Sequence, residues 1–442
     1  MQELDLALEM LHAVLDEKTA FAEALRLRFQ GDLAVRPYRQ AVAGIVGCEL
    51  RHHLLYRHVL KGKFDSEQKE RLVALALSNH LFFHRFDEEA VNEAVEAALT
   101  PEEIESYRAL LSVQNGVEGL LGDQLNRSSN LYLSLRFNTP EWVLKIFQHF
   151  GYGVTYKTIR TYSRPRQNVV RVRGPMAPVL QDGMFVPNAF YPGELADYLG
   201  KTSLRKRADY REGRIYDLKP IAHKILVDHK VEAPCQILLY DGNPTSGLER
   251  DLIDIYGASI GLNIAVPSVE DRPEVTRLIR DQALKNVNFF SAPNGEGLQS
   301  AVSTKQDLVI CAPNSTNFDD IPTSPDYLLR FDKETMDGIL KGEKEALEAC
   351  SAFVEDGGTL LYVVFTISKK EGERTLQEFL VDHPEFVVSS AKQHFPFEKE
   401  SCHAGVYVAE LKKGKEPLTI APSPAGMREG DAHPASAQMK GE

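Results

Sequence analysis

The sequence predicts an all-α N-terminal domain, a small α+β module and a Rossmann-like α/β domain. Two periodic patterns and the chain length carry this prediction. In the first part of the chain, apolar residues recur at helical spacing, beginning with Leu4, Leu8, Leu11 and Leu15. Beyond Pro234, strand-like apolar runs alternate with helical segments, a pattern typical of a mainly parallel sheet with helices on both faces. A chain of 442 residues is longer than one core usually organises, so we expect several domains.

We assign residues 1–127 to the all-helical domain. The segments 41–60 and 71–83 repeat the helical spacing of the first helix. Thr100 precedes Pro101 and stands three residues before Glu103, which is the pattern of a capped helix start. This cap predicts a further helix that ends near Gly122.

The small α+β module and its linker are expected over residues 128–215. TPEWVLKIFQHFGYG reads as a short capped helix, and YKTIRTYSRPRQNVVRVRG follows it with alternating, strand-like residues around a proline turn. Between residues 157 and 224 basic residues outnumber acidic ones, although the whole chain has a net charge of -12. The module is therefore predicted to be the basic part of an acidic protein.

The α/β domain is expected over residues 216–415, followed by a disordered tail at 416–442. Its strands are read from CQILLYDG, GLNIAV, VNFFSAP, QDLVICAP and GGTLLYVVF, with a long helix near Met336 to Val354. The tail is rich in Pro, Gly, Ala and Ser, and it has too little apolar surface to order itself.

Composition excludes several classes of protein. The hydrophobic fraction of 43% and the charged fraction of 26% are those of a folded globular chain. Acidic residues interrupt the N-terminus, and no apolar run reaches the roughly 18 residues that a membrane span needs, so we expect a cytoplasmic protein without membrane contact. Five scattered cysteines form no C-x-x-C pair, so no metal site is predicted.

Longer stretches of the chain resemble one family. PEWVLKIFQHFG with RPRQNVVRVR, GRIYDLKPIAHKI, DLVICAPNST and EDGGTLLYVVFTISKKEGERTLQEFLVDHPEF are similar in content and order to the Nop/Sun-type RNA cytosine-5 methyltransferases. The helical front resembles the NusB-like domain of the bacterial 16S ribosomal RNA member, so the likeness covers almost the whole chain. It implies a NusB-like domain in front of an S-adenosylmethionine methyltransferase domain, with the small module between them.

The positions that would perform methyl transfer are altered. The resemblance implies a cysteine nucleophile that attacks carbon 6 of cytosine, an aspartate that positions the base and a second cysteine that assists release. In this chain the nucleophile position is Phe365, the base-positioning aspartate is Cys311 and the second cysteine is Asn314. Phenylalanine cannot attack a base. Cys311 as a migrated nucleophile is an alternative to a buried structural thiol.

The cofactor positions are altered as well. The acidic residues that the family places after the second and third strands fall near Pro267 and Asn294, and the Gly-Gly-Lys turn is Thr245-Ser246-Gly247. A vestigial cofactor loop is assigned to Asp241, Gly242 and Pro244, where Asp241 either replaces a cofactor carboxylate or only forms the turn. S-adenosylmethionine is therefore the cofactor that the family implies, but we expect that this chain does not bind it.

Basic side chains interleaved with tyrosines indicate an RNA-contacting surface. We assign to it Arg160, Arg164, Arg166, Arg171, Arg173, Arg205, Lys206 and Arg207. The family's Arg-x-Asn signature corresponds by spacing to residues 166–168, or by strand context to residues 171–173.

The sequence thus predicts an RNA-associated protein with a degenerate, inactive methyltransferase domain that binds ribosomal or other structured RNA. One alternative is an active S-adenosylmethionine-dependent ribosomal RNA methyltransferase with relocated catalytic residues, which requires an open, acid-lined pocket near Asp241. Another is a protein–protein interaction module that binds a partner through the helical domain.

Overall fold

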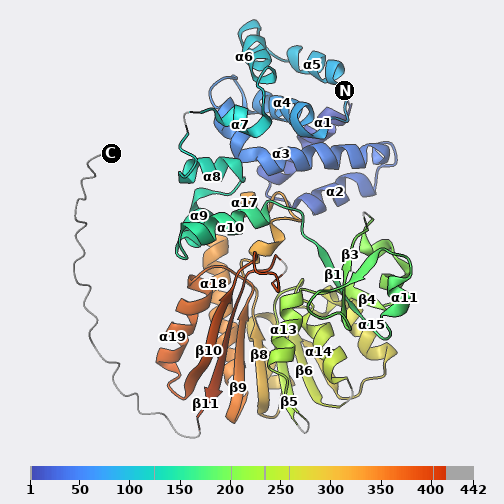
Figure 1. The fold of residues 1–442 in the computed structure, drawn as a ribbon, viewed down its shortest axis with the longest axis vertical. Coiled ribbons are helices and arrows are strands. Elements are labelled where there is room, and N and C mark those ends of the chain that lie inside the picture. The colour runs from blue at the N-terminus through green and yellow to red at the C-terminus, as the bar shows by residue number, and fades with distance from the viewer. Residues whose placement is uncertain are drawn as a thin grey trace, which may run out of the picture.

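The computed structural model describes residues 2–123, 125–200, 202–232, 235–257, 259–401 and 403–414. The predicted tail at 416–442 lies outside these residues. A helical region forms one end of the molecule, a large sheet with flanking helices forms the other, and a small sheet lies beside the large one (Figure 1). The predicted fold class is confirmed.

The helical region buries one continuous core. Leu11, Ile45 and Leu50 are fully buried in it, as expected for apolar residues at helical spacing. Its helices are α1 (Gln2–Leu15), α2 (Phe21–Gln30), α3 (Arg39–Leu60), α4 (Glu67–Ser78), α5 (Glu88–Glu96), α6 (Pro101–Leu111) and α7 (Gly116–Leu121), with short turns η1 (Arg36–Tyr38) and η2 (Asn79–Phe83).

The helix predicted from Thr100 to near Gly122 is two helices. The capping box at Thr100 and Glu103 is present and starts α6. The helix stops at Leu111, and Asn115 then takes a left-handed conformation with φ of 67° before α7 begins. A left-handed residue cannot continue a right-handed helix, so the chain turns there.

Three helices link the helical region to the rest of the molecule: α8 (Asn130–Arg136), α9 (Glu141–Gln148) and α10 (Tyr152–Tyr162). The strand-like interpretation of residues 156–162 is wrong, because they belong to α10. Thr155, Thr158, Ile159 and Tyr162 are the buried residues of this helix, and their spacing is helical.

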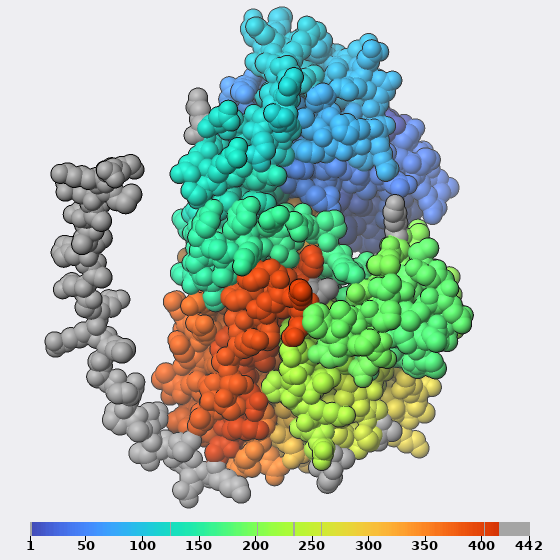
Figure 2. Space-filling view, in the orientation of Figure 1, coloured from blue at the N-terminus to red at the C-terminus, as the bar shows by residue number. Residues whose placement is uncertain are grey.

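The small module is a four-stranded antiparallel sheet in the order β2-β3-β1-β4. Its strands are β1 (Asn168–Val172), β2 (Phe185–Pro187), β3 (Leu195–Tyr198) and β4 (Ile215–Asp217), accompanied by α11 (Ala177–Leu180), η3 (Leu204–Lys206) and α12 (Ala208–Arg211). The module rests on the part of the α/β region coloured yellow-green (Figure 2).

The large sheet has seven strands in the order β10-β11-β9-β8-β5-β6-β7. Strands β5 to β9 are parallel, and β10 and β11 are antiparallel at one edge. The strands are β5 (Gln236–Asp241), β6 (Gly261–Val266), β7 (Val287–Ser291), β8 (Gln306–Ala312), β9 (Val354–Val364), β10 (Phe386–His394) and β11 (Val406–Lys413).

Helices cover the two faces of this sheet, as predicted, and each face has its own apolar core. The connecting elements are α13 (Pro220–Asp228), α14 (Leu248–Tyr256), η4 (Val269–Asp271), α15 (Pro273–Asp281), η5 (Pro293–Gly295), α16 (Leu298–Ala301), η6 (Phe318–Asp320), α17 (Tyr327–Arg330), α18 (Lys333–Ser351), η7 (Lys370–Arg374) and α19 (Thr375–Asp382). Among the described residues, no helix is both long and apolar enough to cross a membrane.

Candidate functional site

The positions that the resemblance assigns to catalysis meet at the carboxyl edge of the large sheet. In the strand register Tyr240 of β5 lies beside Cys311 of β8, and Cys311 lies beside Tyr362 of β9. The backbone N–H of Gly242 donates to the carbonyl of Ala312 at 2.7 Å, which holds the loops after β5 and β8 together. Ligands of open parallel sheets bind at this edge.

Phe365 is part of the protein interior. Its side chain is fully buried, and the Lys219 ammonium lies 4.6 Å from the centre of its ring. Lys219 is itself buried and forms an ion pair with Asp319 at 2.7 Å between Nζ and Oδ2. The Phe365 carbonyl accepts a hydrogen bond from Ser315 Oγ at 3.1 Å. The position predicted from the sequence to correspond to the nucleophile therefore holds a packed aromatic ring under a paired cation.

Cys311 lies on β8 with its thiol away from solvent. It is fully buried next to Cys350, and burial raises the pKa of the Cys311 thiol well above its ordinary value. A thiolate is the reactive form of cysteine, and low pKa and exposure favour it. Cys311 has neither property. Asn314, at the position predicted for the second cysteine, is exposed on the loop after β8.

Asp241 is the last residue of β5, and its carboxylate is buried in the protein interior. It accepts hydrogen bonds from Ser246 Oγ at 2.5 Å and from the backbone N–H of Asn243 at 3.0 Å. Burial, and next the neighbouring Glu249 carboxylate, raise the pKa of Asp241 well above its ordinary value. Glu249 is buried too, and Arg272 Nε lies 3.7 Å from its Oε1. The acid near the strand end is thus engaged by the protein itself.

The rest of the predicted cofactor loop is tightly packed or exposed. Gly242 is buried, and a Cβ there would lie 2.3 Å from the backbone nitrogen of Asn314. Pro244 is exposed. Asn294 contacts Glu345 by a hydrogen bond at 3.3 Å from its Nδ2 to Oε2, and Pro267 has no side-chain donor. None of the three residues Gly242, Pro244 and Pro267 carries a carboxylate, and Asn294 carries an amide.

The basic residues assigned to RNA contact occupy separate places. Arg160 and Arg164 line a cleft of about 580 Å³ between α3, α8, α10 and the loop before α17. We call this the basic cleft, and its charged lining residues are Arg51, Arg136, Arg160 and Arg164. No Asp or Glu is among the described residues that line it. Arg136 pairs with Glu118 at 2.6 Å, but the other three arginines have no carboxylate within ion-pair distance in the described ranges.

Three other arginines of this set are held by carboxylates. Arg171 is buried between Glu194 and Asp251. Arg173 Nε binds both carboxylate oxygens of Asp254, at 2.9 Å and 2.8 Å. Arg166 is mostly buried beside Asp319 at 3.7 Å.

The remaining basic residues belong to the small module. Arg207 pairs with Asp182 and Asp209 and lies over the Phe185 ring. Lys206 is exposed, and Arg205 lines a different cavity, below the module. The structure therefore divides the predicted surface, and Arg160 and Arg164 are its members in the basic cleft.

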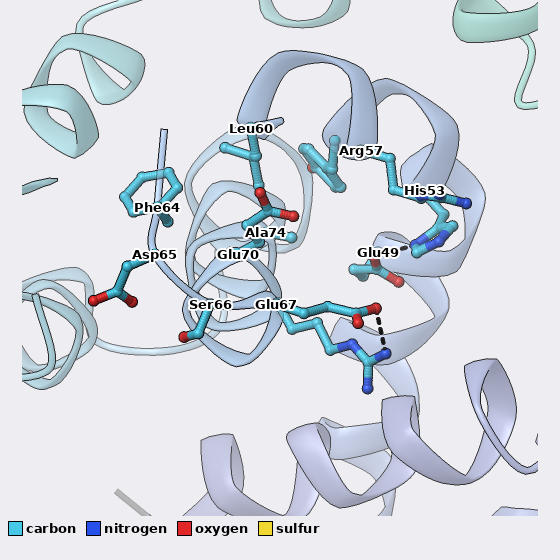
Figure 3. Close-up of a pocket in the computed structure, with 12 residues that line it drawn as sticks. Glu49, His53, Arg57, Leu60, Phe64, Asp65, Ser66, Glu67, Glu70 and Ala74 are labelled. Atoms are coloured by element: carbon cyan, nitrogen blue, oxygen red, sulfur yellow. Dashed lines mark hydrogen bonds and ion pairs between the residues drawn. The ribbon is translucent and has the colours of Figure 1, made fainter. Parts of the chain in front are cut away.

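The helical region contains a pocket that the sequence did not indicate. It has a volume of about 360 Å³ and lies between α3 and α4 (Figure 3). Glu49 accepts from His53 at 2.8 Å, while the second carboxylate oxygen of Glu49 is buried with no hydrogen-bond partner among the described residues. Glu67 pairs with Arg71 at 2.7 Å, and Asp65 and Glu70 add acidity. The i,i+4 spacing of Glu49 and His53 was the only sequence signal, and such pairs are common on helices.

Metal ligands are not gathered in the described residues: no group of three or more His, Cys, Asp or Glu side chains is placed to hold an ion.

The chain resembles known proteins in part of its sequence and in its fold. No protein-family model matches it. Over 84 residues, which are 19% of this chain and 21% of the relative, it is 32% identical to the ribosomal RNA small subunit methyltransferase B of Thermus thermophilus. The match thus spans about a fifth of that relative's length.

Solved structures match over much more of the chain. The crystal structure of PH0851 has a TM-score of 0.66 at 16% identity, with 93% of this chain and 99% of that one covered. NSun6 from Pyrococcus horikoshii, solved with SFG, has a TM-score of 0.53 at 11% identity, covering 63% of this chain and 99% of its own. A methyltransferase homologue from the same organism has a TM-score of 0.52 at 13% identity, covering 65% and 100%.

At these identities the structural likeness establishes the fold. Together with the sequence match, it confirms the resemblance to the Nop/Sun-type RNA methyltransferases that the sequence motifs indicate.

Proposed function

We propose that this chain, which has the fold of the Nop/Sun-type RNA methyltransferases, is an RNA-associated protein that no longer transfers methyl groups. The observation that carries the proposal is the buried Phe365 ring under Lys219, at the position where the family would carry its nucleophile. The ring has no nucleophilic atom, and no thiolate is available from the buried Cys311.

Loss of the cofactor is a second part of the proposal. The side chains at the strand ends give S-adenosylmethionine little to bind, because Asp241 bonds to Ser246 and Asn243 and lies against Glu249. An enzyme with relocated groups would need an accessible carboxylate there. The full burial of Asp241 argues against that alternative.

RNA binding is supported by the basic cleft. The whole chain has a net charge of -12, so contact with a phosphate backbone requires a local concentration of cations. Arg51, Arg160 and Arg164 provide it without a neighbouring acid in the cleft lining. The half-buried Phe137 also lines the cleft, and its ring is of the kind on which bases stack. We expect structured RNA, of which ribosomal RNA is the first candidate by the likeness to the Thermus protein.

The decisive experiment combines two titrations on the whole protein. Calorimetry with S-adenosylmethionine should give no binding heat, and anisotropy with a labelled ribosomal RNA fragment should give a binding curve. The double variant Arg160→Glu/Arg164→Glu should lose RNA affinity, while Arg280→Glu, an exposed arginine of α15 outside the cleft, should retain it. Tight cofactor binding with methyl transfer to RNA, or equal affinity of both variants, would overturn the proposal.

A second candidate function is the binding of a protein partner by the helical region. The pocket of Figure 3 favours it, because one Glu49 oxygen is buried with no hydrogen-bond partner among the described residues. The lining also contains more carboxylates (Glu49, Asp65, Glu67 and Glu70) than arginines (Arg57 and Arg71). A basic side chain of a partner would complement this lining. An arginine-rich peptide should bind the protein, and Glu70→Gln should weaken the binding. A peptide that binds the variant equally well would exclude this site.

A further inference from the structure

A cavity of about 930 Å³ lies between the small module and the α/β region. Six arginines contribute to its lining: Arg173, Arg205, Arg211, Arg250, Arg272 and Arg277. We call it the arginine pocket. It is separate from the basic cleft, since the two share no lining residue. Its arginines come from the end of β1, from η3, α12, α14 and α15, so no single stretch of the sequence indicates the pocket.

We propose that the arginine pocket binds the phosphoryl groups of a free nucleotide-sized polyanion. This proposal goes beyond the RNA association proposed above and does not rest on it. The volume lies within the range of roughly 300–1,000 Å³ typical of small-molecule sites. Arginine is suited to phosphate because its planar guanidinium donates two parallel hydrogen bonds to it.

The strongest evidence is a set of unsatisfied, buried guanidinium groups. Arg272 is 4% exposed, makes no side-chain hydrogen bond to the described residues, and has Glu249 as its nearest carboxylate at 3.7 Å. Arg250 is 8% exposed: its Nη2 donates to the Asp217 carbonyl at 3.2 Å, but its Nε, 3.8 Å from Glu249, has no hydrogen-bond partner among the described residues. Buried donors without acceptors are costly, and a bound oxyanion would satisfy them.

A third guanidinium completes this inner group. Arg173 has a buried Nη2 without a partner, although its Nε is held by Asp254. The guanidinium groups of Arg173 and Arg250 each lie over the Tyr216 ring, with their central carbons 4.6 Å from its centre. Tyr216 is fixed in turn by its hydroxyl, which donates to Asp254 at 2.8 Å. The inner donors are therefore held in place before any ligand arrives, which lowers the cost of binding.

The outer lining brings further positive charge. Arg277 of α15 donates to the backbone carbonyl of Arg211 at 3.3 Å, so both parts of the wall are joined there. A Cβ at Gly213 would lie 3.8 Å from both Arg173 Nη1 and Arg277 Nη2, which shows that these two groups converge. Gly213 has a φ of 74°, which favours glycine at this place.

Acidic residues do not cancel this charge. The acidic lining residues are Glu212, Asp271, Glu274 and Asp281. Glu212 is paired with Arg214 and Asp281 with Arg280, and neither arginine lines the pocket. Arg205, Arg211 and Arg277 have no ion-pair partner among the described residues. The six lining arginines are opposed by Asp271 and Glu274 of the lining and by Glu249 and Asp254 beside the inner arginines, so two cations remain in excess. The half-buried Tyr210 ring also lines the pocket and offers a surface for a nucleobase.

The experiment is calorimetry of the full chain with ATP and, separately, with inorganic pyrophosphate. We expect both to bind, with lower affinity at high salt. Arg272→Gln should weaken pyrophosphate binding about tenfold or more, because a charge-assisted contact is lost. Since Arg272 is buried and its loss can unfold the chain, Arg277→Gln at the exposed rim is the second variant and should weaken both ligands.

Arg280→Gln is the matched control, because Arg280 lies on the same helix, is exposed and does not line the pocket. It should leave both affinities unchanged. Absence of binding, or equal loss in Arg277→Gln and Arg280→Gln, would overturn the proposal. It would also be overturned if Arg277→Gln weakened RNA binding but not ATP binding, which would mean that the phosphate recognised is that of RNA. The RNA titration of Arg160→Glu/Arg164→Glu tests the proposed function separately.

Discussion

Lys219 places its ammonium 4.6 Å from the centre of the Phe365 ring, with both side chains fully enclosed. The cation is balanced by Asp319 at 2.7 Å. The two residues come from the start of α13 and the end of β9, so their contact joins the entry to the α/β region to its last parallel strand. An aromatic side chain at this position is thus a structural element of the core.

Replacement of this ring should destabilise the protein. Phe365→Ala should lower the free energy of unfolding by about 3–5 kcal/mol, because it leaves a cavity and removes the partner of Lys219. Urea unfolding measures the loss. Val381→Ala is the control, since Val381 is 80% exposed, and it should change stability little. Equal stability of Phe365→Ala and the parent would contradict the packing described.

The close approach of the loops after β5 and β8 predicts the effect of a single methyl group. Gly242→Ala should destabilise the chain, because the new Cβ would lie 2.3 Å from the backbone nitrogen of Asn314 and neither loop can move cheaply. We expect the free energy of unfolding to fall by about 1–3 kcal/mol, as measured by thermal denaturation.

Gly338→Ala is the matched comparison for this glycine. Gly338 lies inside α18, and a Cβ there would meet nothing within 4 Å. This variant should gain about 1 kcal/mol of stability from helix propensity. If both alanines had the same effect, the tight contact at Gly242 would not exist.

Buried carboxylates predict a pH dependence of stability. Burial raises the pKa of Glu343 well above its ordinary value, and neither of its oxygens has a hydrogen-bond partner in the described residues. The folded protein therefore holds a proton there that the unfolded chain releases. The stabilisation is full below the unfolded pKa and is lost as pH rises toward the folded pKa, with a slope of at most about 1.4 kcal/mol per pH unit.

Glu343→Gln should reduce this dependence and stabilise the protein at neutral pH, as followed by urea unfolding between about pH 4 and pH 8. Part of the dependence should remain, because burial also raises the pKa of the neighbouring Glu371. Glu334→Gln on the same helix is the control, because Glu334 is exposed. An unchanged slope in Glu343→Gln would mean that this carboxylate is not the buried proton acceptor.

The basic cleft predicts how salt affects RNA binding. The logarithm of the RNA affinity should fall linearly with the logarithm of salt concentration, because phosphate contacts release counterions. Arg164→Gln should lower the magnitude of this slope by about 1, with affinity reduced on all RNA sequences tested. Arg36→Gln, an exposed arginine outside the cleft lining, should leave the slope unchanged. A loss confined to one sequence would indicate base recognition instead.

The periodic parts of the fold could be predicted from the sequence, and the partners of charged residues could not. Leu11 and Leu50 belong to helices whose apolar residues recur at helical spacing, and the inner parts of β5, β8 and β9 (237–239, 308–312 and 360–364) are apolar, so their burial follows from pattern alone. Residues 156–162 were misread as strand-like because alternating polar residues and tyrosines hide the helical spacing of Thr158 and Ile159. The helical conformation of this segment is set by its tertiary packing and not by local propensity.

The candidate site shows the same limit. The position of Phe365 could be assigned from the sequence, because it directly follows the GGTLLYVV segment that resembles the family. Arg171 was read as an exposed RNA contact, but Glu194 and Asp251, which enclose it, lie 23 and 80 residues away in the chain. No local sequence pattern predicts ion pairs between residues so far apart in the chain. The arginine pocket likewise exists only where α14, α15 and the small module meet.

The thiols of Cys311 and Cys350 can be used to measure how often α18 separates from the large sheet. Both are fully enclosed, from β8 and α18 respectively. A thiol reagent can reach them only when the helix leaves the sheet, so the rate at which they become labelled measures how often that layer separates. The slow modification of these two buried cysteines should therefore report local opening between β8 and α18.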